Sequence, residues 1–342
     1  ARSRRAHFAR RLLDDTDLTV TEIAFAAGFG SVRQFNRTCA DVFRAAPLEL
    51  RSRRRSADRL AADGGLTLRL PFQGPLAWGD MLAYLAARAI PGVEHVEGDT
   101  YRRTIEVRGD PGVLELSPGD TDHLLLRAHL PHWDGLIHLA QRARRIMNLD
   151  ADIDEAVASL RADAALRLLV RARPGLRPPG TWDPFETGVR AIVGQQVSVS
   201  GATTITGRLV QRCGTPVPGL AAIGLSHVFP SAETLAGADL SGLGLTTARA
   251  AAIGAFAAAV AHGDIHLDRS LGLDALTASI AAVPGLGPWT AQYLALRLGE
   301  ADAFPATDLV LRRAVDAIGG DPSRWRPWRA YAAIHLWTAE PV

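Results

Sequence analysis

Two glycines between two helical stretches constrain the fold of this chain more than any other feature. The segment 276–299, LTASIAAVPGLGPWTAQYLALRLG, predicts a helix, a Pro-Gly-Leu-Gly turn and a second helix. Glycine accepts backbone angles that other residues avoid, so the turn can pass close to another molecule while the amides of the next helix stay exposed. Because such amides bind phosphate without basic side chains, the pattern predicts a helix-hairpin-helix that clamps a DNA backbone. We expect its contacts to come from Pro284, Gly285, Leu286, Gly287 and Thr290.

A dinucleotide-binding turn is the main alternative, and it is excluded because no parallel strand precedes the glycines. Two further Gly-x-Gly turns occur, at Gly28/Gly30 and Gly242/Gly244, so the pattern is weak without its flanking helices. The sequence leaves open a monovalent cation at the hairpin.

The composition restricts the chemistry that the chain can perform. All 38 Lys and Arg residues are Arg, so no side-chain amine is available for a Schiff base. Two distant cysteines, Cys39 and Cys213, argue against a disulfide framework or a four-cysteine metal site, and the ten His show no ligand spacing. We therefore expect no metal and no cofactor. With no signal peptide and no apolar run that could span a bilayer, we expect a cytoplasmic protein without a membrane partner.

The first 55 residues predict a pair of helices that binds DNA. Thr19 or Thr21 can start one helix, the Gly-Phe-Gly turn at 28–30 breaks it, and Ser31 can cap the next. A second helix of such a pair enters the major groove, where Arg, Gln and Asn read base edges. The outward side chains of this helix are Arg33, Gln34, Asn36 and Arg37.

Arginine clusters flank these helices, with five Arg in residues 1–11 and four in 51–55. They favour a polyanionic partner, and a solvated charged face is the alternative. The stretch TEIAFAAGFGSVRQFNR…FRAAPLELR resembles the second helix-turn-helix of AraC-type regulators, as found in Ada-type methylation-responsive activators. That family carries two such units, so the resemblance implies a missing first unit and a Cys-rich methyl-accepting domain upstream. It also implies promoter DNA as a partner, and we expect the segment to raise affinity for undamaged duplex.

Alternation of apolar and polar residues with period two predicts four strands, at 66–72, 101–107, 112–116 and 123–130. A helix over 78–90 follows the first of them, so we expect a curved antiparallel sheet with a helix on one face. From about residue 134 onward the chain is predicted to be helical. The fold class is therefore mainly α with an α+β domain. The predicted segments are a helix-turn-helix at 1–57, a linker at 58–65, an α+β domain at 66–138 and an all-helical region at 139–342.

Asp308 follows Gly287 within "FPATDLVLRR", where an N-cap is the simple interpretation. Helix-hairpin-helix, short loop, Pro, Asp and helix together are the signature of the HhH-GPD DNA glycosylases. Within them the chain resembles the 3-methyladenine DNA glycosylase II (AlkA) group over roughly residues 66–342. The stretches that carry the resemblance are MLAYLAARAIPGVE (81–94), FETGVRAIVGQQVSV (185–199), VPGLGPWTAQYLALR (283–297) and WRPWRAYAAIHLW (325–337).

This resemblance implies that a damaged nucleotide is flipped out of the duplex into a pocket. Asp308 is then the catalytic residue, which stabilises oxocarbenium character on the sugar or activates the attacking water. Electron-rich rings favour cationic alkylated purines through stacking and cation–π attraction. The implied pocket residues are Trp289, Tyr293, Trp337 and Tyr84, each of which has core packing as its alternative.

Two other features follow from the same resemblance. Related lyases place a Lys two residues after the second hairpin glycine, where this chain has Trp289, so we expect no strand cleavage. Gln195 and Gln196 fall where the family inserts a wedge into the vacated stack, although that wedge is often Leu. Arg312 and Arg313 are candidates for phosphate contacts or for a solvated face.

The sequence thus predicts a monomeric, monofunctional DNA glycosylase that excises alkylated purines of the 3-methyladenine type from double-stranded DNA, fused to part of an Ada-type regulator. The alternative is a transcriptional activator whose glycosylase-like half only binds damaged DNA. A bifunctional lyase is a third interpretation, and the missing Lys opposes it.

Overall fold

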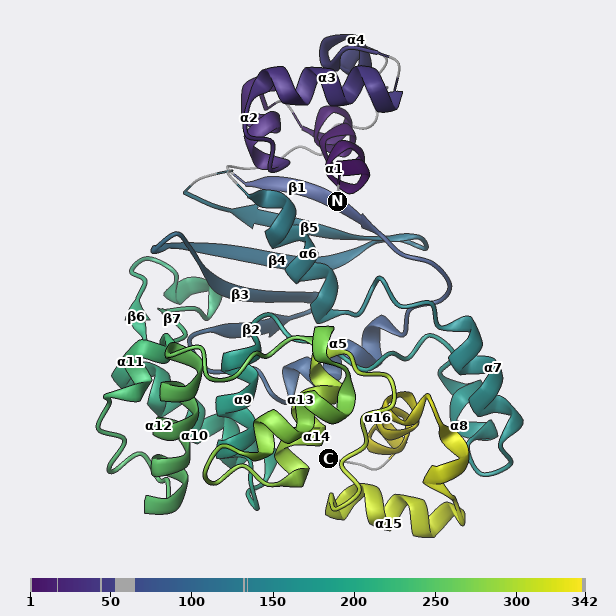
Figure 1. The fold of residues 1–342 in the computed structure, drawn as a ribbon, viewed down its shortest axis with the longest axis vertical. Coiled ribbons are helices and arrows are strands. Elements are labelled where there is room, and N and C mark those ends of the chain that lie inside the picture. Colours follow the sequence, from purple (N-terminus) through teal and green to yellow (C-terminus); the bar gives the residue numbers. More distant parts are fainter. Residues whose placement is uncertain are drawn as a thin grey trace. The chain divides into compact units, whose positions relative to one another are not determined.

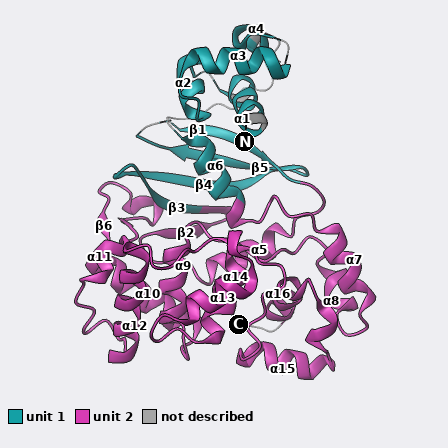
Figure 2. Cartoon of the chain, in the orientation of Figure 1, with its two compact units in different colours: residues 1–72, 102–144 teal, residues 73–101, 145–342 magenta. Residues whose placement is uncertain are grey.

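The computed structural model describes residues 2–16, 18–43, 45–52, 65–131, 133 and 135–339. Its contacts divide the chain into two compact units, formed by residues 1–72 with 102–144 and by residues 73–101 with 145–342 (Figure 2). Apart from Gly65, the predicted linker lies outside the described residues, as do the three arginines at positions 53–55.

The first unit begins with four helices: α1 (Arg2–Asp15), α2 (Val20–Ala26), α3 (Val32–Phe43) and α4 (Pro47–Ser52). Thr19 caps α2 as predicted, in a capping box in which the Glu22 amide donates to Thr19 Oγ1 at 3.2 Å and the Thr19 amide donates to Glu22 Oε2 at 2.7 Å. Phe35 and Cys39 of α3 are fully buried, also as predicted. These helices therefore form a helix-turn-helix with the outward face that the sequence indicated.

Five strands form one sheet in the order β1-β5-β4-β3-β2 (Figure 1). Their bounds are β1 (Leu66–Pro71), β2 (Glu94–Glu97), β3 (Thr100–Val107), β4 (Asp110–Asp120) and β5 (His123–His129). β5 pairs antiparallel with β1 and β4, so that Leu126 lies opposite both Leu68 and Leu116. All three leucines are buried, because directly opposed residues of neighbouring strands point to the same face of the sheet. The four predicted strands are present, and the short β2 is an addition.

The helix that accompanies the sheet differs from the predicted one. The predicted helix 78–90 is α5 (Trp78–Ala86), and it belongs to the second unit, where Asp80 pairs with Arg173 at 2.7 Å. The first unit instead contains α6 (Leu136–Ile146) up to residue 144, and Arg144 Nη1 donates to the Pro71 carbonyl at the end of β1 at 2.7 Å. Sequence order placed α5 with the strands, and it does contact the short strand β2, but the Asp80–Arg173 pair also ties it to a residue much later in the chain.

The second unit is mainly helical, and its other elements appear in Figure 1. Its helices are α7 (Asp154–Ala162), α8 (Arg167–Ala172), α9 (Pro184–Val193), α10 (Val199–Cys213), α11 (Ala232–Ala236), α12 (Thr247–Ala261), α13 (Leu273–Ala281), α14 (Pro288–Leu298), α15 (Leu309–Ile318) and α16 (Arg329–Ala339). Three short 3₁₀ turns, η2 (Ala221–Ile223), η3 (Arg269–Leu271) and η4 (Pro322–Trp325), and a small hairpin of β6 (Thr215–Pro216) and β7 (His227–Val228) complete it.

One apolar core joins most of these helices. Phe185 of α9 stacks on Phe256 of α12 with ring centroids 5.5 Å apart. Gly188 makes this close packing possible, since a Cβ atom there would lie 2.3 Å from the Phe256 ring. The predicted fold class, mainly α with an α+β domain, is confirmed. Among the described residues, no helix combines the length and hydropathy that a bilayer crossing requires.

Candidate active site and DNA-binding elements

Asp308 is the N-cap of α15, and its carboxylate is also bonded to two tryptophans. Oδ1 accepts hydrogen bonds from the Leu311 amide at 3.0 Å and from Trp337 Nε1 at 3.2 Å. Oδ2 accepts a hydrogen bond from Trp289 Nε1 at 2.9 Å. The capping interpretation is thus correct but incomplete, because a capping role alone needs no indole donors. Three donors from three helices hold both oxygens of a half-buried carboxylate in one orientation.

The four predicted pocket aromatics come together beside this carboxylate. Trp289 and Tyr293, one turn apart on α14, are stacked with centroids 5.3 Å apart and planes at 8°. The Trp337 ring meets Tyr293 edge-on at 6.1 Å. The Tyr84 hydroxyl, from α5, lies 3.2 Å from the Tyr293 hydroxyl. All four side chains are half-buried, so they form an aromatic cluster with accessible surface next to Asp308.

Two arginines that were not among the predicted site residues lie against the tyrosines. Arg297 Nη1 donates to Tyr293 Oη at 3.1 Å and to Tyr84 Oη at 3.4 Å. The guanidinium of Arg88 lies 3.8 Å from the centroid of the Tyr84 ring. The spacing of Tyr293 and Arg297, four residues apart on one helix, was the available sequence signal.

These charges separate the pKa values of the two phenols. Burial alone raises the pKa of Tyr293. The charges of Arg297 and Arg88 and the hydrogen bond from Tyr84 lower this pKa by a larger amount, to about 7. The pKa of Tyr84 is raised, first by burial and then by its tyrosine neighbour. Arg297 keeps a raised pKa although burial opposes its charge, because both tyrosines favour the charged form.

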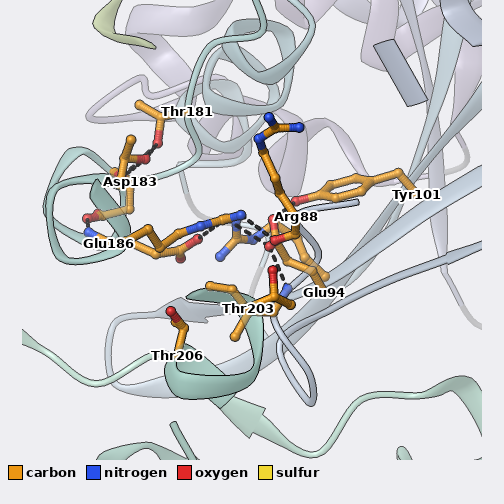
Figure 3. Close-up of polar contacts among 12 residues, drawn as sticks. Arg88, Glu94, Tyr101, Thr181, Asp183, Glu186, Thr203 and Thr206 are labelled. Carbon is orange, nitrogen blue, oxygen red and sulfur yellow. Dashed lines mark hydrogen bonds and ion pairs between the residues drawn. The ribbon is translucent and has the colours of Figure 1, made fainter. Parts of the chain in front are cut away.

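A buried ionic network fixes the segment that follows α5 (Figure 3). Glu94 accepts hydrogen bonds from Tyr101 Oη at 2.6 Å and from Arg190 Nη1 at 2.9 Å. Arg190 also pairs with Glu186 on its own helix at 3.6 Å and donates to the Arg88 carbonyl. Burial lowers the pKa of Arg190, but the two carboxylates raise it by more. The network anchors α9 to the chain beside Tyr84 and Arg88.

The hairpin between α13 and α14 has the backbone that the glycines predicted. Gly285 has φ 85°, and a Cβ atom there would lie 2.5 Å from the Cβ of Ala252 on α12. Gly287 is the N-cap of α14, receives no side-chain cap and faces open space. Exposed residues on both sides of Leu286 leave the backbone accessible at the positive end of the α14 dipole.

Two predicted hairpin contacts are placed differently from the rest. Leu286 is packed in the core, and Thr290 is 1% exposed with its Oγ1 accepting a hydrogen bond from Gln195 Nε2 at 3.0 Å. Their side chains support the hairpin from beneath and do not reach its surface. Backbone groups and the exposed Pro284, Gly285 and Gly287 remain available for a phosphate.

The loop between α9 and α10 separates the two predicted wedge residues. Gln195 Nε2 also donates to the Gly285 carbonyl at 3.1 Å, and Arg249 donates to the Gln195 carbonyl. The side chain of Gln195 is therefore engaged in holding the loop against the hairpin. Gln196 is exposed with φ 55°, a left-handed conformation that is uncommon for a residue other than glycine. Of the two, Gln196 has the geometry of a projecting wedge.

The helix-turn-helix presents its predicted contact residues at the surface, with one change of role. Arg33, Gln34, Asn36 and Arg37 are all exposed. Gln34, however, accepts a hydrogen bond from the Gly30 amide at 2.9 Å, while its own amide donates to Ser31 Oγ at 3.2 Å. Gln34 thus helps to fix the start of α3, because its backbone amide bonds to the Ser31 hydroxyl and its side-chain oxygen accepts from the turn residue Gly30.

Among the described residues, no group of three or more His, Cys, Asp or Glu could hold a metal ion. Arg312 and Arg313 are exposed on α15. The site therefore consists of a fixed carboxylate, an aromatic cluster backed by arginines, and a glycine hairpin joined to a projecting loop.

Comparison with known proteins identifies three successive regions of the chain. Residues 1–53 match a family model described as a helix-turn-helix domain. Residues 67–183 match the AlkA N-terminal domain, and residues 189–337 match the HhH-GPD superfamily of base excision DNA repair proteins. The fold and the site therefore define an HhH-GPD DNA glycosylase with a helix-turn-helix domain.

Full-length relatives narrow this class to one family. A Mycobacterium tuberculosis protein named "Probable bifunctional transcriptional activator/DNA repair enzyme AlkA" is 41% identical over 350 residues, which cover 99% of this chain and 70% of the relative. The "DNA-3-methyladenine glycosylase 2" of Escherichia coli is 35% identical over 280 residues, or 79% of this chain and 96% of that enzyme. The chain belongs to the AlkA family of DNA glycosylases.

A solved structure shows the same fold at low identity. The 3-methyladenine DNA glycosylase from Archaeoglobus fulgidus superposes with a TM-score of 0.68 at 21% identity, over 79% of this chain and 97% of that one. The predicted resemblances to the glycosylase group and to the AraC-type helix-turn-helix are thus confirmed at the level of family and domain.

Proposed function

We propose that this glycosylase excises alkylated purines of the 3-methyladenine type from double-stranded DNA, without strand cleavage. The observation that carries the proposal is Asp308, a carboxylate held by two indole N–H groups at the edge of the Trp289, Tyr293 and Trp337 cluster. An aromatic cluster attracts a cationic base through its π faces. The name of the Escherichia coli relative supports the same substrate class.

Hydrolysis at this site requires little acid catalysis. As the bond between deoxyribose C1′ and the purine nitrogen breaks, its electron pair leaves with the base, and a cationic alkylpurine departs neutral without being protonated. Positive charge develops on the sugar, where the carboxylate of Asp308 stabilises it. Water then adds to C1′ and releases one proton, for which Asp308 is the nearest base in the proposal. The indole donors keep the carboxylate in place for both roles.

DNA binding is divided between elements in this proposal. The amides of the α14 N-terminus and the Gly285–Gly287 backbone hold a phosphate near the lesion, and Gln196 enters the vacated stack. The exposed Arg33, Asn36 and Arg37 contact promoter or undamaged duplex DNA. We propose that the chain acts as a monomer on cytoplasmic DNA, with its regulatory role resting on the helix-turn-helix.

A glycosylase assay tests the proposal directly. Incubation of the full chain with duplex DNA that carries methylated purines should release free base and leave intact strands with abasic sites. Binding of the same DNA without any release of base would support an activator that only recognises damage. Release of base together with strand scission would contradict the monofunctional mechanism.

Borohydride trapping tests the lyase question independently. We expect no covalent enzyme–DNA adduct through a side chain, because the sequence contains no Lys. An adduct that maps to any side chain of the sequence would refute this expectation.

A further inference from the structure

Arg297 is a buried guanidinium whose hydrogen-bond partners are all formally uncharged. It is 6% exposed, and its Nε and Nη2 donate to the carbonyls of Pro179 and Gly180, both at 2.7 Å. Its remaining donor, Nη1, is directed at Tyr293 and Tyr84. No carboxylate of the described residues lies within ion-pair distance of Arg297. A buried charge without a counter-charge is costly, so this arrangement calls for a nearby anion.

The carboxylates in the neighbourhood are already committed to another arginine. Glu94 and Glu186 both pair with Arg190 on α9. Arg88, just after α5, lies over the Tyr84 ring and donates to the Tyr84 carbonyl at 3.3 Å, and no carboxylate of the described residues lies at ion-pair distance from it. Asp308, the other carboxylate of the site, is bonded to Trp289 and Trp337. Arg88 and Arg297 therefore have no carboxylate of the described residues at ion-pair distance, and positive charge gathers beside the tyrosines.

The two phenols are placed so that one of them can supply the missing anion. Tyr293 Oη can accept hydrogen bonds from Arg297 Nη1 and from the Tyr84 hydroxyl. A phenolate oxygen with two such donors is stabilised, because hydrogen bonds to the charged form favour ionisation. In this arrangement Tyr84 keeps its proton and donates it. The opposite pKa directions of the two residues agree, with Tyr293 lowered to about 7 and Tyr84 raised.

We propose that Tyr293 is the negative counter-charge of the base pocket, and that its phenolate selects purines made cationic by alkylation. This inference rests on the proposed function and adds a charge-specific group to the same site. With a neutral Tyr293, a cationic base entering the cluster meets the excess charge of Arg88 and Arg297. With a phenolate, that excess is cancelled, and the stacked Trp289–Tyr293 pair gains negative charge. A neutral base gains nothing from the ionisation.

The two tryptophans that face Tyr293 cannot supply this pH-dependent negative charge. Trp289 and Trp337 are uncharged, and both donate to Asp308, the remaining carboxylate of the site. Asp308 is present both in wild type and in a Tyr293 variant. A ratio of their rates therefore isolates Tyr293.

Tyrosinate absorbance provides a direct test, because the chain has only four tyrosines. Ultraviolet difference titration of the full chain should show one phenolate forming with a midpoint of about 7. Tyr293→Phe should remove that step. Tyr331→Phe is the matched control, since burial raises the pKa of this core tyrosine and its loss should leave the step unchanged. Arg88→Met should move the midpoint upward, which keeps the proposal testable if Tyr293→Phe does not fold.

Single-turnover excision then tests what the phenolate selects. The ratio of wild-type to Tyr293→Phe rate on 3-methyladenine in methylated duplex should rise between pH 6 and pH 8 by on the order of ten-fold, the size of a desolvated cation–π term. The same ratio on hypoxanthine, a neutral purine, should stay flat.

The outcomes separate the inference from the function on which it rests. No release of methylated base at any pH would refute the proposed function, while the absorbance step would still report the phenolate. Release with a flat ratio, a rise shared by hypoxanthine, or no phenolate step near neutral pH would each overturn the assignment to Tyr293.

Discussion

Two of the three Gly-x-Gly turns in the chain lead into helices whose first turns differ: one helix start is capped by side chains and the other is not. In the helix-turn-helix, Gly28 has φ 76°, and in the hairpin, Gly285 has φ 85°. The helix after the first turn is capped, because Gln34 closes the Gly30 amide and Ser31 accepts from Gln34. The helix after the second turn starts at Gly287 without any side-chain cap.

This difference decides what each turn can bind. A capped helix start has its amides satisfied, so α3 offers its side chains Arg33, Asn36 and Arg37 to DNA. An uncapped start leaves amide donors free at the positive end of the helix dipole, so α14 offers its backbone. The turn at Gly242–Gly244 follows the capped pattern, since Thr246 accepts from the Arg249 amide. A Gly-x-Gly turn alone therefore indicates a tight bend, and the capping residue indicates its use.

The largest expected effect comes from the acid that follows the uncapped hairpin. Asp308→Asn should lower the single-turnover excision rate by about 10²–10³-fold, because the removed charge acts mainly in the transition state. Affinity for damaged duplex should be kept, since the Asn oxygen can still accept from the Leu311 amide.

Asp321→Asn is the matched control for this substitution. Asp321 caps η4 by accepting from the Ser323 amide at 3.0 Å, and it makes no hydrogen bond to a pocket residue of the described chain. Its substitution should leave the rate unchanged. Wild-type excision by Asp308→Asn would show that the aspartate is only a cap.

The second effect compares Gly285 and Gly28, the positive-φ glycines of the hairpin and of the helix-turn-helix. Gly285→Ala should lower the free energy of unfolding by about 2–4 kcal/mol, because left-handed strain adds to the overlap with Ala252. Gly28→Ala should cost about 1–2 kcal/mol, since the nearest atoms around its new Cβ lie at 3.6 Å and only the strain remains. Chemical denaturation of each variant gives both values.

A third glycine separates folding from DNA contact. Gly287 has φ −93° and open space around it, so Gly287→Ala should fold normally. It should nevertheless weaken binding to damaged duplex if the backbone approaches a phosphate there. Unchanged binding by Gly287→Ala would place the phosphate elsewhere.

Most local features were predictable because they depend on neighbours in the sequence. Period-two alternation located β1 and β3–β5, and the caps at Thr19 and Ser31 follow from residue type and spacing. The short β2, with only four residues, offers too little alternation to be seen. Asp308 and the pocket aromatics were located through a family resemblance, since an isolated aspartate before a helix predicts only a cap.

The unpredicted part of the site depends on pairs that are distant along the chain. Tyr84 and Tyr293 are 209 positions apart, and Glu94 and Arg190 are 96 apart. Arg297 was not predicted to be a site residue, because an arginine in a helix is usually exposed. Its burial against two carbonyls and two phenols requires the tertiary structure. Similarly, the paired glutamines at 195–196 look alike in sequence, and only the fold assigns one to the hairpin and the other to the surface.

The third effect concerns DNA binding through the side chains of the helix-turn-helix. Replacing both Arg33 and Arg37 with Ala should weaken binding to undamaged duplex by on the order of ten-fold and reduce the salt slope by about two, near one unit per lost phosphate contact. Single-turnover excision at saturating enzyme should not change.

Arg161→Ala, at an exposed arginine of α7, is the control and should leave the slope unaltered. A large fall in the excision rate of the double variant would show that the helix-turn-helix takes part in the chemical step.

The smallest effect compares the two glutamines that hold the turns. Gln34 accepts from a turn amide, and Gln195 donates to a turn carbonyl. Gln34→Ala should destabilise the start of α3 by about 1 kcal/mol, the usual value of a lost cap. Gln195→Ala should cost a similar amount but also loosen the loop that carries Gln196, because one side chain bridges Gly285 and Thr290.

Kinetics and stability together separate these two roles. We expect Gln34→Ala to keep the wild-type excision rate. Gln195→Ala should lose about as much stability, but its excision rate should also fall a few-fold, which is the effect expected from the loss of one or two hydrogen bonds. Gln195→Glu sharpens the test, since it keeps the size of the side chain but sets a carboxylate against the Gly285 carbonyl. If Gln34→Ala and Gln195→Ala reduce excision equally, the two turns are not specialised in the way that their caps indicate.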